Sequence, residues 1–165
     1  MTNSWQVRRV ATREEAVLDQ VELLFLDMYD YMADHGLSNS LAADGAKKWR
    51  VGVEQTLGRL GTLAVAESDK QVIGFSRGVI RLSPDHLTSE KIGFVDHTFV
   101  CAKWRGKGVG RKMFESLEEW FSSKGVQKLE LQVLCGNTSA INAWQAMGFQ
   151  PELMQMQKIA DNLNK

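Results

Sequence analysis

Residues 91–110 read KIGFVDHTFVCAKWRGKGVG, an apolar run followed by closely spaced glycines. Its first ten residues, Lys91 to Val100, are rich in β-branched and aromatic side chains and predict a strand. Gly106, Gly108 and Gly110 then stand at alternate positions. Glycine lets the chain turn without a Cβ clash, and successive glycines leave backbone N–H groups uncovered. The sequence therefore predicts a strand followed by a loop that can hold an anion.

The loop opens an amphipathic helix. Apolar side chains recur after it at helical spacing, namely Val109, Met113, Phe114, Leu117, Trp120 and Phe121. A helix N-terminus carries partial positive charge and free amides, so phosphate is its natural ligand. Four basic residues add full charges where the helix dipole is also positive, which favours an anionic partner: Arg105, Lys107, Arg111 and Lys112.

Two common phosphate loops do not fit this stretch. A P-loop needs Ser or Thr after its Gly-Lys pair to bind magnesium, but Lys107 is followed by Gly108. The dinucleotide fingerprint fails because its third glycine would fall on Met113 or Arg111. A nucleotide-binding regulator is therefore not favoured.

The pattern Arg105-x-x-Gly108-x-Gly110, after a strand ending at Val100, resembles the acetyl-coenzyme A loop of the GNAT acetyltransferase superfamily. Residues 129–149, LELQVLCGNTSAINAWQAMGF, are similar to a strand, Asn-x-x-Ala helix and closing Gly-Phe of the same family. The two blocks stand in the family's order. The resemblance covers the last half of the chain strongly and the first half in its order of elements.

The 165 residues predict a single domain, residues 1–165, with one core. As the resemblance implies, we expect an α/β fold with a GNAT-like mixed, mostly antiparallel central sheet and helices on both faces, splayed between the strands ending near Val100 and Leu134. Before residue 91 the sequence predicts a strand at 5–10 and a helix that runs from a capping box at Thr12–Glu15 to Gly36. A second helix at about 41–60, with Leu60 inward, and strands at 62–67 and 72–81 follow. Beyond the glycine-loop helix it predicts a strand at 126–134, a helix at 138–147 and an alternating tail at 153–158.

Charge and composition limit the partners. The 20 basic and 20 acidic residues balance, and no basic block suggests nucleic acid or an anionic membrane. No apolar run has the length of a signal core or membrane span, so we expect a cytoplasmic protein. Cys101 and Cys135 have no metal-like spacing, which predicts free thiols and no metal. A homodimer is conceivable through Trp5, Trp49 or the Met-rich tail.

The resemblance implies acetyl-coenzyme A as cosubstrate. In the family the loop amides hold the pyrophosphate, and the backbone at the position of Val100 pairs with the pantetheine arm like an added strand. A backbone N–H of Val100 or Cys101 would then polarise the thioester carbonyl. The implied cofactor-binding residues are Phe99, Val100, Ala102, Arg105, Gly106, Lys107, Gly108, Val109, Gly110, Arg111 and Asn137.

Acetyl transfer also needs a base, because an amine with a pKa near 10.4 is protonated at neutral pH. Asp96 and His97 occupy strand positions where many relatives carry an acidic pair. Neighbouring strand residues point to opposite faces, so only one of them can face the acceptor directly. Asp96 ranks first because it shares the face of Val100, whereas His97 has the better intrinsic pKa. Either residue could instead be purely structural.

The leaving thiolate lacks its usual proton donor. Relatives commonly carry Tyr four residues after Ala140, but Trp144 stands there, and an indole does not donate a proton near neutral pH. A thiol with a pKa of about 8.5 leaves tolerably without an acid. Water, Cys135, Tyr29 or Tyr31 could also replace the donor, in which case Trp144 only packs.

Residues 27–35 mix carboxylates with both tyrosines of the chain. They form either a solvated helix face or, as the resemblance implies, an acceptor wall with Tyr29, Tyr31 and Asp34 as substrate-binding residues. We expect an N-acetyltransferase that acts by direct attack of a small-molecule or peptide amine in a ternary complex. An acetyl-cysteine route through Cys101 or Cys135 is less favoured. The alternative is a non-catalytic module that binds coenzyme A or acyl-coenzyme A.

Overall fold

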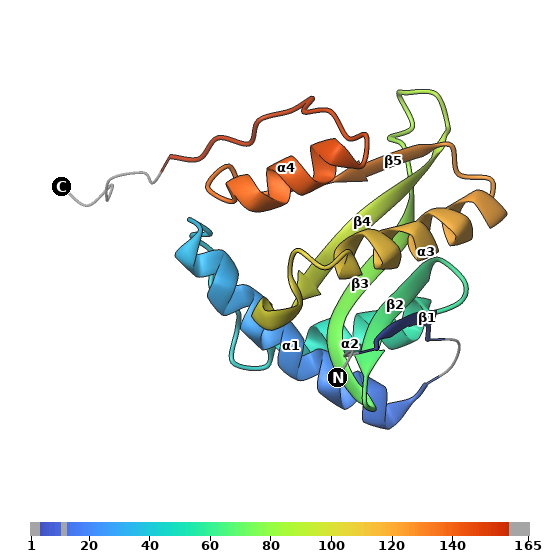
Figure 1. Cartoon of the computed structure of the whole chain (residues 1–165). Helices are drawn as coiled ribbons and strands as arrows, with labels where there is room; N and C mark the ends of the chain where they lie inside the picture. The colour runs from blue at the N-terminus through green and yellow to red at the C-terminus, as the bar shows by residue number, and fades with distance from the viewer. Residues whose placement is uncertain (1–3, 11–12, 159–165) are drawn as a thin grey trace.

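The computed structural model describes residues 4–10 and 13–158 (Figure 1). Thr12 of the predicted capping box lies outside them, and the first helix begins directly after Glu14. The elements are, in order, β1 (Gln6–Arg9), α1 (Glu15–Asp34), α2 (Gly45–Thr56), β2 (Gly61–Ser68), β3 (Gln71–Leu82), β4 (Lys91–Val100), the 3-10 helix η1 (Ala102–Trp104), α3 (Val109–Ser123), β5 (Lys128–Leu131) and α4 (Thr138–Ala146).

The five strands form one sheet in sequence order, β1-β2-β3-β4-β5. The pairs β1–β2, β2–β3 and β3–β4 are antiparallel, whereas β5 runs parallel to β4. The predicted hairpin between β2 and β3 is confirmed. Its turn residues, Asp69 and Lys70, both have positive φ, as a two-residue turn of type I′ requires. The prediction of a mixed, mostly antiparallel sheet is therefore confirmed.

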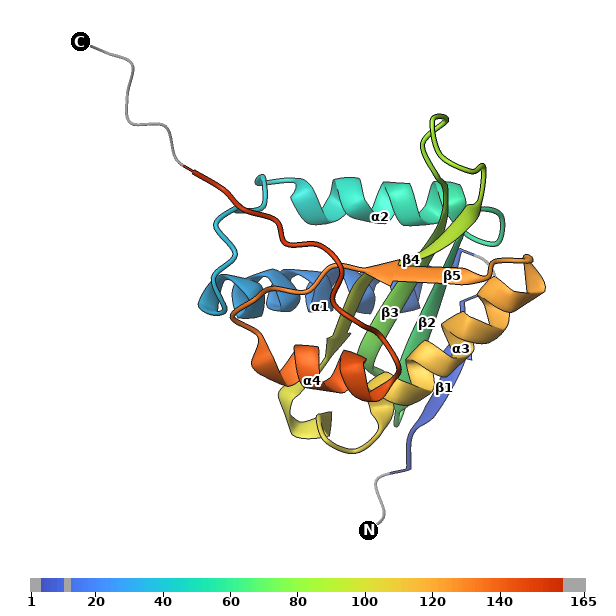
Figure 2. The same ribbon diagram turned by 90° about the horizontal axis from the view of Figure 1, so that it is seen from above.

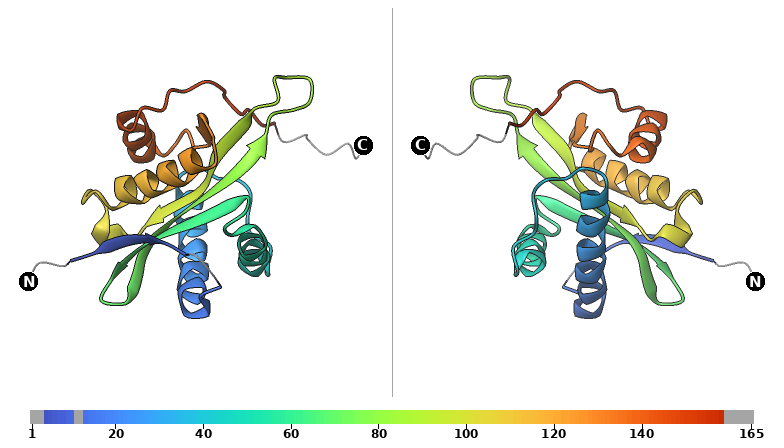
Figure 3. Two further views of the ribbon diagram at one scale, coloured as in Figure 1. Left: turned by 90° about the vertical axis from the view of Figure 1, so that its right-hand side faces the viewer. Right: turned by 90° about the vertical axis from the view of Figure 1, so that its left-hand side faces the viewer.

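Helices cover both faces of the sheet. Figures 2 and 3 show α1 and α2 on one face and α3, with α4 beside it, on the other. Phe25, Val53 and Phe75 are buried in the core beneath α1 and α2, and Met113 and Leu117 in the core beneath α3. Burying one such side chain contributes roughly 1.5–3 kcal/mol. The central strands are apolar on both sides because both faces are covered.

The sheet opens between β4 and β5. Their pairing starts at Ile92 opposite Lys128 and ends at Val95 opposite Leu131. Strand β4 continues to Val100, and within residues 4–10 and 13–158 no strand pairs with its last five residues on that side. We call residues 96–100 the free edge of β4. The predicted splay is confirmed, although β5 is shorter than the predicted 126–134.

Two other predicted elements need correction. The second helix spans only Gly45–Thr56, because Leu57 leaves helical geometry and Gly58 turns the chain at positive φ. Leu60, predicted inward, is 54% exposed. Residues 153–158 form no strand, and in this tail Gln157 Oε1 accepts a hydrogen bond from Ser38 Oγ at 3.0 Å.

The possible dimer contacts can also be placed. Trp49 stacks on Phe25 with ring centroids 4.1 Å apart, so it belongs to the core of the subunit. Met154 and Met156 are exposed, and a homodimer stays a prediction. Within the described ranges, no helix is long and apolar enough to cross a membrane.

Candidate active site

The free edge of β4 exposes the backbone of Val100. The amide of Cys101 donates to the carbonyl of Ile73 on β3 at 2.9 Å. Backbone groups of successive residues alternate in direction along an antiparallel strand, so the N–H and C=O of Val100 point away from β3, towards the gap beside β5. The Cys101 N–H therefore cannot polarise a thioester carbonyl, and that alternative was wrong. The Val100 N–H remains.

Arg105 lies along this edge. Its Nε donates to the carbonyl oxygen of Val100 at 2.8 Å, and its guanidinium stacks on Tyr31 at 4.3 Å and Phe99 at 5.3 Å. To reach a phosphate at the start of α3, Arg105 would have to give up the hydrogen bond to Val100. Its predicted role at the phosphates stays a prediction.

The glycine loop presents free amides. Gly106 and Gly108 have φ of 72° and 82°, and Gly108 is the N-cap of α3. A Cβ on either glycine would meet open space. In the described part of the chain, the amides of Val109, Gly110 and Arg111 have no hydrogen-bond acceptor. This arrangement fits a phosphate group, since positive φ and uncovered amides occur together at the positive end of a helix dipole.

The side chains around the loop hold the start of α3 in place. Val109 is buried beneath the helix, and Arg111 donates to the carbonyl of Ala146 in α4 at 3.3 Å. Ala102 and Lys107 are exposed, and the Lys107 ammonium lies 5.1 Å from the Trp104 ring. Of the predicted phosphate contacts, Lys107 is therefore open to an anion, whereas Arg111 is engaged with α4.

Asp96 and His97 lie on the same side of the sheet. Arg77 pairs with His97 and Gly78 with Val95, so Asp96 is an extra residue in a β-bulge. The bulge breaks the alternation, and His97 Nδ1 lies 3.1 Å from Asp96 Oδ2. Both side chains face α1 and α2, whereas Val100 packs in the α3 core. The predictions that they point to opposite faces and that Asp96 shares the face of Val100 were wrong.

The Asp96 carboxylate is strongly engaged. It forms an ion pair with Arg77, and Arg81 lies 3.7 Å away. Burial raises the pKa of Asp96, but the hydrogen bond and charge of His97 together with the charge of Arg77 outweigh burial and lower that pKa below 3.8. A carboxylate that holds its negative charge so firmly is a poor proton acceptor at neutral pH. Asp96 is suited to orient His97 instead.

Aromatic rings surround His97. Phe25, Trp49 and Tyr29 lie with ring centroids 5.2, 5.8 and 6.5 Å from the imidazole. Trp49 Nε1 is 3.3 Å from the same Nδ1 that contacts Asp96. A single nitrogen cannot accept from the indole and donate to the carboxylate in one tautomer. Because the carboxylate is the stronger acceptor, we assign the proton to Nδ1, which leaves the lone pair on Nε2.

The two tyrosines divide between two regions. Tyr29 faces the His97 cluster, and burial and then the charge of Asp96 raise its pKa. Tyr31 instead joins the free edge of β4, where its hydroxyl lies 3.4 Å from Asn137 Oδ1. Asn137 also caps α4 by accepting from the amide of Ala140 at 3.2 Å. Asp34 is exposed and is not brought to either region.

Three further predicted residues can be placed. Trp144 packs edge-on against Phe114 and Phe149, each with centroids 5.5 Å away, as the packing interpretation requires. Burial and the nearby Asp27 raise the pKa of the Cys101 thiol, which disfavours it as a nucleophile. Cys135 is exposed. In residues 4–10 and 13–158, no three potential ligands gather to hold a metal ion.

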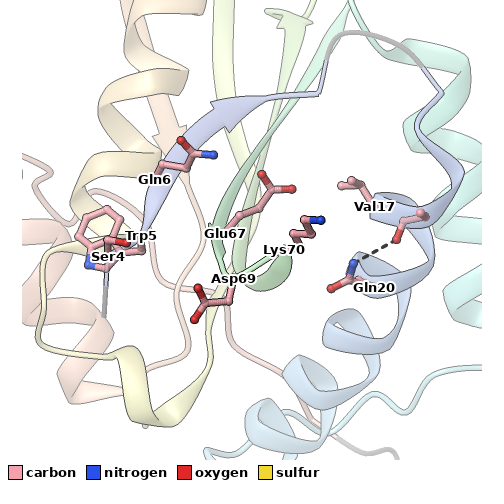
Figure 4. Close-up of a pocket in the computed structure, with 9 residues that line it drawn as sticks. Ser4, Trp5, Gln6, Val17, Gln20, Glu67, Asp69 and Lys70 are labelled. Atoms are coloured by element: carbon pink, nitrogen blue, oxygen red, sulfur yellow. Dashed lines mark hydrogen bonds between the residues drawn. The ribbon is translucent and has the colours of Figure 1, made fainter. Parts of the chain in front are cut away.

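A cavity of about 550 Å³ lies elsewhere, between the start of β1, the first turns of α1 and the β2–β3 turn (Figure 4). Its wall includes Trp5, Glu67 and Lys70, and none of the predicted site residues lines it. We therefore place the candidate active site at the free edge of β4 and the start of α3.

Several known proteins are similar to this chain. The model of the acetyltransferase (GNAT) family matches residues 25–149. The chain belongs to this family. An aminoglycoside N(6′)-acetyltransferase type 1 of Stenotrophomonas maltophilia is 28% identical over 86 residues, which cover 50% of this chain and 55% of that enzyme. An uncharacterized N-acetyltransferase of Bacillus subtilis, YobR, is 32% identical over 59 residues, or 36% of this chain and 24% of YobR. The chain thus matches about half or less of the length of these relatives.

Solved structures share the fold. The aminoglycoside N-acetyltransferase AAC(6′)-Iy in complex with CoA superposes with a TM-score of 0.75 at 18% identity, covering 97% of this chain and 98% of that one. A predicted acetyltransferase from Clostridium acetobutylicum with acetyl-CoA gives 0.70 at 14% identity, covering 94% and 96%. These likenesses confirm the GNAT fold that the two sequence blocks predicted.

Sequence reasoning missed two residues of the site. Arg77 was assigned only to a strand, although a cation inside a buried strand, between Ser76 and Gly78, was a signal that it needed a partner. Trp49 was expected only to point inward, but its indole also reaches His97.

Proposed function

We propose that this GNAT protein is an acetyl-coenzyme A dependent N-acetyltransferase that acts on an amine of a small molecule by direct attack in a ternary complex. The observation that carries this proposal is the continuity of three features. The Val100 N–H at the free edge of β4 leads to the free amides of Val109 and Gly110, and the His97 imidazole lies on the same strand as Val100.

Each part of the chain has a distinct task. The amides at the start of α3 and Lys107 would hold phosphate, while the backbone of Val100 would pair with the pantetheine arm and its N–H would polarise the thioester carbonyl. Acetyl-coenzyme A supplies the activated acetyl group. For the arm to pair with the Val100 carbonyl, Arg105 must move aside.

His97 is the base in this proposal. Its Nδ1–H is directed at Asp96, whose charge is balanced by Arg77, so Nε2 is the atom that accepts the amine proton, directly or through water. Asp96 stabilises the imidazolium that results, as a buried carboxylate does in a catalytic triad. The ranking of Asp96 over His97 as base is therefore reversed.

The acceptor is proposed to be cationic. Asp27, Asp30 and Asp34 share one exposed side of α1, since they are three and four residues apart, and they would attract a molecule with several ammonium groups. The aminoglycoside acetyltransferases among the relatives act on molecules of this kind by name, and one solved neighbour carries a bisubstrate analogue of CoA and acetylneamine.

Thiol release from acetyl-coenzyme A with a panel of amines tests the function. The panel contains neamine, spermidine, an amino acid and a peptide, and mass spectrometry identifies the acetylated product. We expect amine-dependent release with neamine or spermidine, and loss of that release in His97→Gln. Tight binding of coenzyme A without turnover on any amine would instead indicate the non-catalytic binding module.

A further inference from the structure

We propose that Tyr31, supplied by α1, donates the proton to the leaving thiolate and so replaces the tyrosine that is missing at position 144. This inference rests on the proposed acetyltransferase function. Trp144 cannot serve, because its indole does not give up a proton near neutral pH and its ring is packed between Phe114 and Phe149.

Two contacts define the position of Tyr31. Its ring packs on His35 with centroids 4.1 Å apart, and the Arg105 guanidinium lies 4.3 Å from the ring centroid. The same Arg105 donates to the carbonyl of Val100. When Arg105 moves aside for the arm, as proposed above, the space that its guanidinium leaves lies between the phenol and the backbone group at which the thioester is expected.

The end of α1 is held firmly against the loop that precedes α4. A Cβ on Gly136 would clash with the carbonyl oxygen of His35, so glycine permits this close approach. The approach brings the Tyr31 hydroxyl to Asn137, 106 residues away in sequence. Asn137 is one of the residues that the resemblance implies for coenzyme A binding, so we expect the hydroxyl to lie at the arm rather than at the acceptor.

The Tyr31 hydroxyl donates only a weak hydrogen bond. Its distance of 3.4 Å to Asn137 Oδ1 is long, since O–H···O bonds cluster near 2.7–2.8 Å, and that oxygen already accepts from Ala140. A thiolate sulfur that forms nearby would be a stronger acceptor. Tyr29 is less suited, because its ring faces His97 and Phe25.

The proton balance is complete. The amine nitrogen forms a bond to the carbonyl carbon, the carbon–sulfur bond breaks, and its electron pair remains on sulfur, which takes the Tyr31 proton. The ammonium nitrogen loses one proton before it attacks and a second one after its bond to carbon has formed. Both protons pass through His97 to solvent, and solvent returns one proton to the Tyr31 phenolate, so that one proton is released in total. No oxidant or further reactant is needed.

Kinetics of Tyr31→Phe provide the first test, with neamine or spermidine as acceptor. The substitution keeps the ring that stacks on Arg105 and His35, so folding is not at risk. We expect kcat to fall about tenfold to hundredfold, at the low end of general acid catalysis because a thiolate leaves moderately well, while the KM for acetyl-coenzyme A stays within about threefold. A fall in kcat of less than about fivefold, or a change in KM alone, would overturn the role of Tyr31 while leaving the acetyltransferase function intact.

A second test needs no acceptor. The chain has two tyrosines, so Tyr31 is the single tyrosine in Tyr29→Phe, and the difference absorbance of its phenol can be followed as a ligand binds. Bound coenzyme A should give a phenol difference spectrum that bound desulfo-coenzyme A does not give, because only the ligand with sulfur can accept a hydrogen bond from the hydroxyl. Identical spectra with the two ligands would overturn the proposal. An inactive wild-type enzyme would refute the proposed function, whereas these spectra would still report whether Tyr31 meets the sulfur.

Discussion

Replacing Asp96 by Asn tests whether this carboxylate orients His97 or acts as the base itself. In the folded protein Asp96 and Arg77 are 15% and 12% exposed, and the substitution leaves the Arg77 guanidinium with contacts of 3.3 Å to Thr56 Oγ1 and 3.4 Å to the carbonyl of Gly52. Removing one partner of a buried ion pair costs about 3–5 kcal/mol. Because both side chains retain some contact with water, we expect Asp96→Asn to lower the free energy of unfolding by about 3 kcal/mol.

Urea unfolding at pH 7 measures this loss, with Asp19→Asn as the matched control. Asp19 also pairs with an arginine, Arg50, but its side chain is 66% exposed, so the control should lose at most about 1 kcal/mol. The effect also has a defined pH dependence. Since the pKa of Asp96 is lowered in the folded state, its contribution is complete above the ordinary value of 3.8 and is lost as the pH falls through the folded pKa. The difference between wild type and variant should therefore close only in acid.

The activities of the same variants complete the test. We expect kcat/KM to fall about tenfold in Asp96→Asn, which loses orientation, and about hundredfold or more in His97→Gln, which loses the base. The acidic limb of the pH profile should persist in Asp96→Asn and disappear in His97→Gln. If Asp96→Asn is as stable as wild type and abolishes the acidic limb, then Asp96 is the base and the reasoning from its ion pair is wrong.

Three further substitutions give separate outcomes. Arg105→Ala should weaken coenzyme A binding about threefold to tenfold and make the affinity less dependent on salt, because a cation predicted to lie near the phosphates is lost. If calorimetry at two salt concentrations gives the same affinities as for the wild type, Arg105 does not contact the phosphates. Cys101→Ala should keep its activity, and mass spectrometry should find no acetyl group on Cys101 of the wild type, because the pKa of the Cys101 thiol is raised. An adduct present in the wild type and absent from the variant would support the acetyl-cysteine route. Trp144→Phe should retain at least about half of the single-turnover rate of acetyl transfer. A loss of about a thousandfold in a folded variant would mean that the indole N–H holds a reacting group.

The parts of the site that sequence predicted well are local. The strand to Val100, the turn at Gly106 and Gly108 and the helix that follows are set by residues adjacent in sequence, whose periodicity and glycine positions are directly visible. Their order, together with the second block at 129–149, was sufficient to identify the family and the splayed sheet.

The parts that sequence did not predict depend on pairing between distant residues. The bulge at Asp96 arises from the register of β4 against β3, and strict alternation therefore assigned Asp96 to the wrong face. The contact of Tyr31 with Asn137 joins α1 to the loop before α4. The second helix was overextended because apolar spacing continued to Leu60, past the turn at Gly58 that ends the helix.

Calorimetry of Gly108→Val beside Gly125→Val tests whether coenzyme A binds at the start of α3. Gly108 precedes α3 and Gly125 follows it, with φ of 82° and 72°. A Cβ would meet open space at either glycine. Valine should therefore impose similar backbone strain at the two ends of the helix. Melting curves should show similar losses of stability. We predict that Gly108→Val weakens coenzyme A binding by at least about tenfold, or about 1.4 kcal/mol, while Gly125→Val binds like wild type. Equal affinities in all three proteins would contradict a phosphate site at this loop.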